Sequence, residues 1–147
     1  MANIVIIEDM LPQAEAIVKK VSPEHKVIIV TSGNDIKLLG NDKIRATGYD
    51  YDKNGTPIPN NWEGKPDFYI FDLRMPGESG IKIWERLGKP ENYVVLSLWA
   101  EELFWRDKMD EAGMDLDRAI KKKVDINEVY EKIEPYISAI IKRENTN

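Results

Sequence analysis

The sequence of 147 residues contains no cysteine and only one histidine, His25. Disulfides and thiolate metal sites are therefore excluded, and a single imidazole cannot supply a cluster of histidine ligands. His25 follows Ser22-Pro23-Glu24, so we interpret it as a loop residue. The chemistry of the protein has to come from carboxylates, hydroxyls and amines.

Long apolar runs and an excess of positive charge are also missing. No stretch approaches the length of a membrane span, and no charged segment followed by an apolar one marks a secretory signal. The formal net charge of -5 argues against direct binding of nucleic acid. A composition of 42% hydrophobic and 32% charged residues is typical of a globular domain. We expect one cytoplasmic domain over residues 1–147, without membrane insertion.

Short apolar runs alternate with helical patterns along most of the chain. The expected strands cover residues 3–9, 26–33, 67–73, 93–99 and, more weakly, 118–122. The expected helices cover residues 11–21, 79–88, 100–112 and 125–144, the last with Asp125 and Glu128 at capping-box spacing. Such alternation predicts an α/β fold with a doubly wound, five-stranded parallel sheet and a site at the carboxyl ends of its strands.

Residues 40–66 interrupt this alternation. Part of this segment resembles a calcium loop, with the first, third, fifth and sixth positions occupied by Asp50, Asp52, Asn54 and Gly55. The twelfth position is Asn61 rather than glutamate, and Pro57 and Pro59 exclude a flanking helix. Because Asn54-Gly55 is a strong hairpin signal, we favour a β-hairpin here over a calcium site.

Polar residues end the expected strands. Glu8 and Asp9 end the first, Asp72 the third, Ser97 the fourth and Lys122 the fifth. A parallel sheet brings these ends to one edge, where three carboxylates need a cation, and oxygen ligands without cysteine or histidine favour Mg²⁺. A lysine and a hydroxyl beside them can hold a phosphoryl group, with Asp72 as the nucleophile that forms an aspartyl phosphate.

These segments resemble the response-regulator receiver domain of two-component signalling. FDLRMPGESG is similar to its phosphoacceptor segment, since Asp72, Met75, Pro76 and Gly80 fit the pattern Asp-x-x-Met-Pro-x-x-x-Gly. IVIIEDM, VVLS and AIKKKVDINEV resemble its first strand, its fourth strand and its fifth strand. The resemblance covers roughly residues 3–142 apart from 40–66. It implies a flavodoxin-like sheet of order 2-1-3-4-5, with a hairpin-like insertion that replaces much of the second helix.

The resemblance also implies a function. A stand-alone receiver similar to the chemotaxis regulators would take a phosphoryl group on Asp72 from a sensor histidine kinase or a phosphotransfer protein. Ser97 and Lys122 would contact the phosphoryl group. The implied Mg²⁺ ligands are Glu8, Asp9, Asp72 and the backbone carbonyl of Arg74. Such a chain is not a metabolic enzyme, although it assists its own phosphorylation and dephosphorylation. It would act on a downstream protein, without direct contact to nucleic acid, as a monomer or weak homodimer.

Several positions depart from the family pattern. Ala119 replaces the usual switch aromatic, Leu98 a small residue, and Lys123 a proline. These departures favour an alternative, a pseudo-receiver that binds partners without phosphorylation. A third class, a hydrolase of the haloacid dehalogenase type, would need an aspartate where Arg74 stands. Arg74 and Trp99 occupy positions that influence phosphoryl loss in receivers, and their bulk suggests slow attack by water.

Three aromatic side chains follow the fourth expected strand: Trp99, Phe104 and Trp105. Exposed rings there would suit a partner surface. We expect at least one ring to pack into the core, and Phe104 rather than Trp105.

Overall fold

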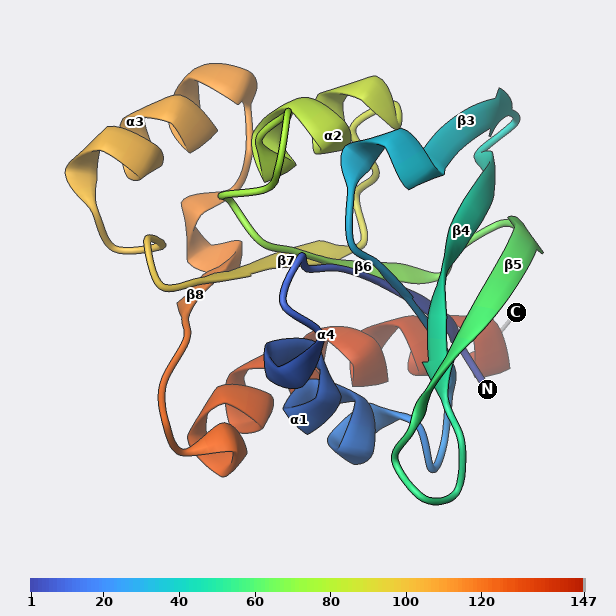
Figure 1. Cartoon of the computed structure of the whole chain (residues 1–147). Helices are drawn as coiled ribbons and strands as arrows, with labels where there is room; N and C mark the ends of the chain where they lie inside the picture. Colours follow the sequence, from blue (N-terminus) through green and yellow to red (C-terminus); the bar gives the residue numbers. More distant parts are fainter. Residues whose placement is uncertain (147) are drawn as a thin grey trace.

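The computed structural model describes residues 1–146, with side chains described for residues 1–143, so Asn147 of the predicted domain lies outside it. One mixed sheet of eight strands forms the centre of the molecule (Figure 1). Its parallel strands are β1 (Asn3–Ile7), β2 (Lys26–Val30), β6 (Phe68–Phe71), β7 (Tyr93–Ser97) and β8 (Ala119–Lys121). β1 pairs with β2 and β6, and β7 pairs with β6 and β8. The prediction of a purely parallel, five-stranded sheet was too simple, because three antiparallel strands extend it.

Helices cover both faces of the sheet. Helices α1 (Leu11–Val21) and α4 (Ile126–Thr146) lie on one face, and α2 (Gly80–Arg86) and α3 (Leu103–Ala112) on the other (Figure 1). Two short 3-10 helices, η1 (Gly33–Asp35) and η2 (Leu116–Arg118), precede strands β3 (Ile36–Gly40) and β8. No described helix combines the length and apolar character needed to cross a membrane.

The alternation of side chains along the strands builds two cores. In β1, Ile4 and Ile6 face the core under α1 and α4, whereas Val5 and Ile7 face the core under α2 and α3. Because helices cover both faces of the sheet, apolar residues follow one another along β1 without polar residues between them. At the start of α4 the predicted cap is confirmed, since Asp125 Oδ1 accepts the Asn127 amide at 3.0 Å.

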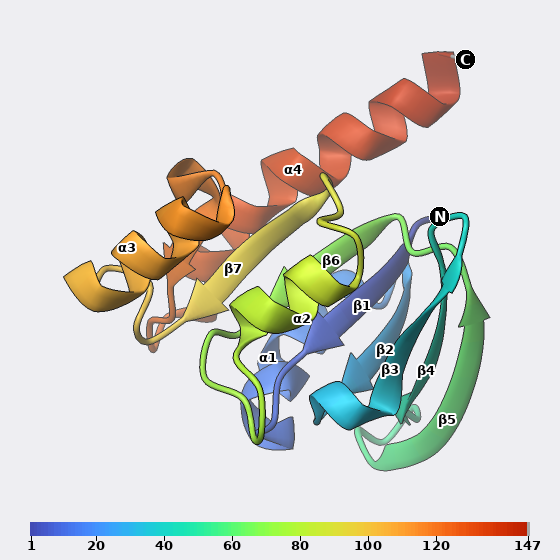
Figure 2. The same cartoon turned by 90° about the horizontal axis from the view of Figure 1, so that it is seen from above.

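The insertion is a three-stranded antiparallel unit: β3 (Ile36–Gly40), β4 (Lys43–Tyr51) and β5 (Pro57–Gly64). Strand β4 pairs with both β3 and β5, and its only paired contact with β2 is Ile29 opposite Tyr49. Figure 2 shows these strands on the side of β2 away from β7. The predicted hairpin is confirmed as β4 and β5, but β3 was not foreseen. No helix remains between β2 and β6 apart from the short η1.

The insertion covers the face of the sheet that it adjoins. Ile36, Ile44 and Ala46 are fully buried in the same core as α2. Arg86 of α2 fixes this contact, because its guanidinium donates to the carbonyls of Gly33 at 2.7 Å and Ile36 at 2.8 Å. Three strands thus bury apolar surface in the segment where the family resemblance implies a helix.

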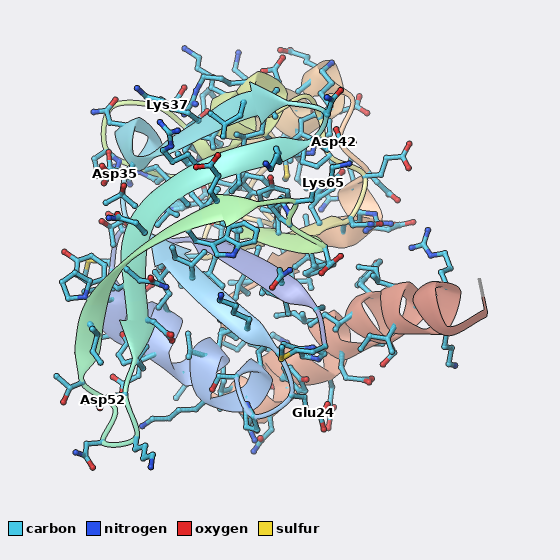
Figure 3. The ribbon with its side chains drawn as sticks, turned by 90° about the vertical axis from the view of Figure 1, so that its right-hand side faces the viewer. Glu24, Asp35, Lys37, Asp42, Asp52 and Lys65 are labelled. Atoms are coloured by element: carbon cyan, nitrogen blue, oxygen red, sulfur yellow. The ribbon has the colours of Figure 1, made fainter. Side chains whose placement is uncertain are left out.

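Of the acidic residues that resembled a calcium loop, Asp50 is paired with Ile58 within the hairpin strands, and Asp52 lies at the hairpin tip (Figure 3). Asp52 Oδ1 accepts the amides of Asn54 at 2.8 Å and Thr56 at 2.9 Å. The flanking elements are strands, and the Tyr51 hydroxyl donates to the Leu11 carbonyl at 3.0 Å, which attaches the hairpin to α1. The Asp52 carboxylate therefore has a structural role in the turn.

Two side chains are placed differently from the sequence interpretation. Phe104 is 60% exposed, whereas Trp105 is partly buried against the core under α3. The prediction that at least one ring packs into the core is confirmed, but the choice of Phe104 rather than Trp105 was wrong. The reason is helical periodicity, since Trp105 lies one turn before the fully buried Met109. His25 does lie in a turn, but it is buried, and its Nδ1 accepts the Ala2 amide at 3.1 Å.

Gly48 allows β4 to cross close to β2. A Cβ atom at this position would collide with the backbone carbonyl of Ile29. Gly48→Ala should therefore reduce the free energy of unfolding by about 1–3 kcal/mol, measured by urea unfolding, because either strand has to shift. Thr47→Ala, in an exposed neighbouring position, is the matched control. Equal stability of the two variants would contradict the close crossing.

Candidate functional site

Three carboxylates gather where β1 and β6 end. The two strands are parallel neighbours, with Ile7 opposite Phe71, and the Asp72 amide donates to the Ile7 carbonyl at 2.9 Å. Glu8 and Asp9 follow β1 directly, and Asp72 follows β6. One carboxylate oxygen from each of these three residues lies within 4.8 Å of the others. The predicted convergence of the acidic residues at one edge is therefore present.

Lys122 provides the positive charge of this cluster. Glu8 is 4% exposed and Asp72 8% exposed, while Asp9 is more accessible. The Lys122 ammonium contacts Glu8, lies 3.1 Å from Asp72 Oδ2, and donates to Gln13 Oε1 at 2.6 Å. Since unpaired buried carboxylates are costly, this lysine stabilises the cluster.

The cluster lies close to the start of α2. Gly80 begins this helix, and its amide donates to the Leu73 carbonyl at 2.9 Å. A Cβ atom at Gly80 would collide with the Asp72 carbonyl oxygen. The Leu73 amide in turn donates to Asp72 Oδ1 at 2.7 Å. The glycine of the recognised pattern thus has a physical role, which is to let α2 start against the backbone of Asp72.

The pKa values of the two buried carboxyl groups, Glu8 and Asp72, are shifted in opposite directions. Burial raises the pKa of Glu8 from 4.5 to about 8, and the neighbouring Asp72 adds to this rise while Lys122 opposes it. Burial also acts to raise the pKa of Asp72, but Glu8, Lys122 and Ser97 together hold it below its ordinary value. At neutral pH and without a cation, these opposite shifts favour a single proton shared by the pair, held on Glu8 rather than on Asp72.

Ser97 ends β7 and is fully buried. The Lys122 amide donates to the Ser97 carbonyl at 3.1 Å, which ties the ends of β7 and β8 together. The Ser97 hydroxyl accepts the Trp99 amide at 3.2 Å. Its contact with a phosphoryl group stays a prediction. No described peptide bond is cis, including the one between Lys122 and Lys123.

An open pocket of about 390 Å³ lies over the cluster. The Arg74 guanidinium stacks on the Trp99 ring, 5.0 Å from its centroid, at one side of the pocket. Leu98 also lines the pocket, but it is 53% exposed and so does not fill it. That the Arg74 carbonyl binds metal stays a prediction.

Gln13 and Met10 were missed by sequence reasoning. Both line the pocket, and Gln13 holds the Lys122 ammonium. A signal was available, because the loop after the first strand and the first turn of the following helix lie at the carboxyl edge of a parallel sheet. Glutamine carries no charge, so it did not stand out beside the acidic pair.

The donor set fits a hard divalent cation. Among the described residues, Glu8 Oε2 is the buried side-chain oxygen or nitrogen that has no hydrogen-bond partner. Such an orphaned carboxylate oxygen costs free energy unless it is protonated or binds a cation. Because carboxylate oxygens from Glu8, Asp9 and Asp72 lie close together, the site is suited to Mg²⁺.

Comparison with known proteins identifies the fold. No protein-family model matches the sequence, and the curated proteins contain no match. Among solved structures, the unphosphorylated HemR receiver domain of Leptospira biflexa is similar, with 19% identity and a TM-score of 0.63 over 94% of this chain and 95% of that one. A CheY-like receiver domain of Methanospirillum hungatei has 15% identity and a TM-score of 0.65 over 97% and 98%. The Mn²⁺-bound response regulator Rcp1 has 13% identity and a TM-score of 0.58 over 92% and 91%.

These matches define the class of structure. The chain has the α/β fold of response-regulator receiver domains, over nearly its full length. An antiparallel insertion extends the sheet of that fold, and an acidic cluster of Glu8, Asp9 and Asp72 lies at its carboxyl edge.

Stability without metal should depend on pH through Glu8. The folded-state pKa of about 8 lies above the ordinary 4.5, so this contribution to stability is complete below pH 4.5 and is lost as the pH rises to about 8. Glu8→Gln lacks this titration. Its stability relative to the unmodified protein should therefore increase steadily over that pH range, measured by urea unfolding with EDTA present.

The exposed Glu131 of α4 provides the control. Glu131→Gln should show no such pH-dependent gain. A stability difference between Glu8→Gln and the unmodified protein that stays constant with pH would contradict the raised pKa of Glu8.

Proposed function

We propose that residues 1–147 form a receiver domain that accepts a phosphoryl group on Asp72 from a histidine kinase or a phosphotransfer protein. The observation that carries this proposal is the meeting of Glu8, Asp9, Asp72 and Lys122 at the carboxyl edge of a receiver-type sheet. An isolated acidic cluster would have many explanations, but this one lies on a fold that the chain shares with response-regulator receiver domains.

Asp72 is suited to be the nucleophile. Its lowered pKa keeps the carboxylate deprotonated at neutral pH. In the proposed transfer, an Asp72 oxygen forms a bond to phosphorus as the bond from phosphorus to the donor histidine nitrogen breaks. The imidazole keeps the electron pair and takes up a proton. Lys122, already 3.1 Å from Asp72 Oδ2, would contact the oxygens of the transferred group together with the Ser97 hydroxyl.

Glu8, Asp9, Asp72 and the carbonyl of Arg74 are the residues that would hold Mg²⁺. The ion supplies positive charge that neutralises the oxygens of the transferring phosphoryl group. Glu8 has to lose its proton before it can act as a ligand, so its raised pKa makes binding weaker at low pH. Rcp1, which shares the fold, has been solved with Mn²⁺ bound.

Output would occur through contact with a downstream protein or by passing the phosphoryl group onward. Leu103 and Phe104 of α3 are 74% and 60% exposed, which supports a partner surface on this helix. The expectation of a monomer or weak homodimer belongs to the same proposal.

A pseudo-receiver is the alternative reading. Ala119 stands where receivers have a switch aromatic, and Lys122 already contacts both buried acids without a ligand. The hydrolase reading lacks comparable support, because the Arg74 side chain lies over Trp99 where that class needs a second carboxylate.

Phosphorylation is testable with acetyl phosphate and Mg²⁺. The expected product is a phosphoryl adduct on Asp72 that hydroxylamine removes, detected by intact mass, with release of acetate. Trp99 borders the pocket, so tryptophan fluorescence should respond as well. Asp72→Asn should abolish the adduct. Asp110→Asn, an exposed aspartate on α3, should leave it unchanged.

The same experiment separates the readings. A folded protein that forms no adduct and shows no response to Mg²⁺ with beryllofluoride would support the pseudo-receiver. Continuous release of phosphate with turnover would support the hydrolase.

The lifetime of the adduct should depend on the stacked pair over the pocket. Arg74→Ala and Trp99→Ala should each raise the rate of autodephosphorylation several-fold, because water gains access to the phosphoryl group. The double variant should be little faster than either single one, since the two side chains act as one contact. Trp105→Ala is the control on α3. Rates that rise little in Arg74→Ala and Trp99→Ala would contradict this prediction.

A further inference from the structure

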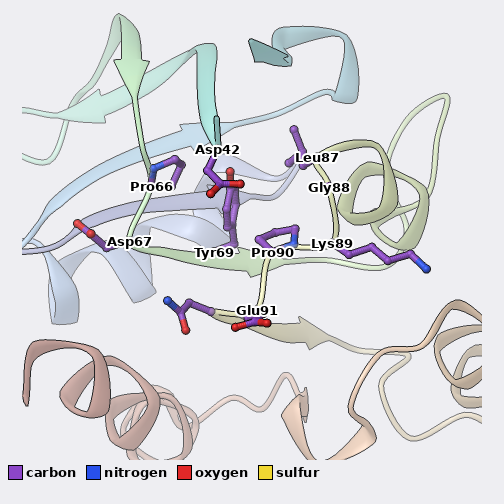
Figure 4. A pocket seen from close by; sticks show the side chains of 10 residues that line it. Asp42, Pro66, Asp67, Tyr69, Leu87, Gly88, Lys89, Pro90 and Glu91 are labelled. Carbon is purple, nitrogen blue, oxygen red and sulfur yellow. The ribbon is translucent and has the colours of Figure 1, made fainter. Parts of the chain in front are cut away.

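A second pocket, of about 460 Å³, lies at the opposite edge of the sheet (Figure 4). Three segments surround it: the β3–β4 turn with Asp42, the residues before β6 with Pro66 and Asp67, and the loop 87–92 between α2 and β7. It therefore lies where β6 and β7 begin, whereas the acidic cluster lies where β1 and β6 end. Nothing in the proposed phosphoryl transfer uses it.

The charges that line this pocket are mostly negative. Asp42, Asp67 and Glu91 line it, and Lys89 is its single basic residue. The Lys89 ammonium lies 5.8 Å from the centroid of the Trp84 ring, and Figure 4 shows this side chain directed away from the pocket. Within the described part of the chain, none of the three acids forms an ion pair. Asp67 Oδ2 accepts the Asn3 amide at 2.7 Å, so the carboxylates of Asp42 and Glu91 are the ones available to a ligand.

Tyr69 is a buried polar group aimed into the pocket. Its side chain extends from β6 toward Asp42 (Figure 4), and the residue is only 4% exposed. Stacking on Phe71, with 5.3 Å between ring centroids, holds the ring in place. Among the described residues, the Tyr69 hydroxyl has no hydrogen-bond partner. The ring is buried and the hydroxyl borders the pocket, so a ligand there can form a hydrogen bond with a group that has no partner within the described residues.

The backbone around the pocket is held in place by hydrogen bonds. The Trp84 indole donates to the Pro90 carbonyl at 2.9 Å, and the Lys89 amide donates to the Trp84 carbonyl at 3.0 Å. On the other side, Asn41 and Asp42 adopt left-handed φ angles of 53° and 63° in the turn between β3 and β4. This turn belongs to the insertion, and it places Asp42 opposite the Tyr69 hydroxyl.

The spacing of the acids distinguishes between kinds of cation. Within the described residues, the only carboxylates gathered closely enough to share a metal ion are Glu8, Asp9 and Asp72. The acids of the second pocket are more dispersed, which suits a ligand with several separated N–H donors. A carboxylate paired with an ammonium or guanidinium group forms a strong, charge-assisted hydrogen bond.

We propose that this pocket binds a small organic cation, an alkylammonium or guanidinium compound. Asp42 and Glu91 would accept its N–H groups, and the Tyr69 hydroxyl would accept a further one. The same chemistry is carried by a free amine and by a lysine or arginine side chain of another protein. The proposal does not depend on phosphorylation of Asp72.

Isothermal titration calorimetry of the whole chain with 1,4-diaminobutane and with agmatine tests this proposal. Tyr69→Phe removes only the hydroxyl, and Asp42→Asn removes one charge from an exposed turn. Each should weaken binding by about tenfold, the scale of one charge-assisted hydrogen bond. Asp107→Asn removes the same charge from the exposed surface of α3 and should leave the affinity unchanged. Circular dichroism and thermal unfolding verify that the variants are folded.

A third titration, with arginine blocked at both ends, distinguishes the sources. Binding of agmatine and blocked arginine alike supports recognition of a protein side chain, and binding of the free amines alone supports a small molecule. Absence of binding at millimolar ligand, or equal affinity in all variants, would overturn the proposal. So would loss of binding in Asp72→Asn but not in Tyr69→Phe, because it would place the cation in the acidic cluster.

Discussion

The structure depends on one electrostatic constraint, the confinement of Glu8 and Asp72 at a buried edge of the sheet. Parallel pairing of β1 and β6 holds these two carboxylates close together. Lys122 reaches them from the end of β8, two strands beyond β6, and a proton on Glu8 completes the neutralisation. Without a ligand, the Glu8–Asp72 pair and Lys122 together are thus nearly neutral. A divalent cation would exchange with the Glu8 proton, so metal binding, pH and stability are linked at this edge.

Strand β6 connects this edge to the other one. It carries Tyr69 near its start, and Asp72 follows its end. Side chains on both faces are buried throughout, so the strand is fixed between the two cores. Residues at the two ends of β6 are therefore held in fixed positions, although different loops surround each end. The same rigidity that presents Asp72 to the carboxyl edge presents Tyr69 to the amino edge.

The sequence predicted the helices, the parallel strands and the acidic cluster, because apolar periodicity and strand-end polarity are local signals. It did not predict β3, whose residues IKLLG lack a clear alternation and become a strand only by pairing with β4. The buried position was predicted for Phe104 instead of Trp105. Adjacent residues of a helix face different directions, and tertiary packing decides which of them faces the core. The role of Gln13 was missed because an uncharged side chain gives no signal until Lys122 is placed beside it.

Replacing a helix by strands creates an exposed sheet edge, which the chain has to protect. Within the described residues, β5 pairs only with β4, so its other side is open. Pro57 and Pro59 lack the N–H groups that a further strand would need, and Glu63 adds a charge near the far end. Addition of a partner strand is therefore disfavoured along this edge. In the proposed binding of an organic cation, the insertion would contribute its β3–β4 turn, because that turn brings Asp42 to the pocket.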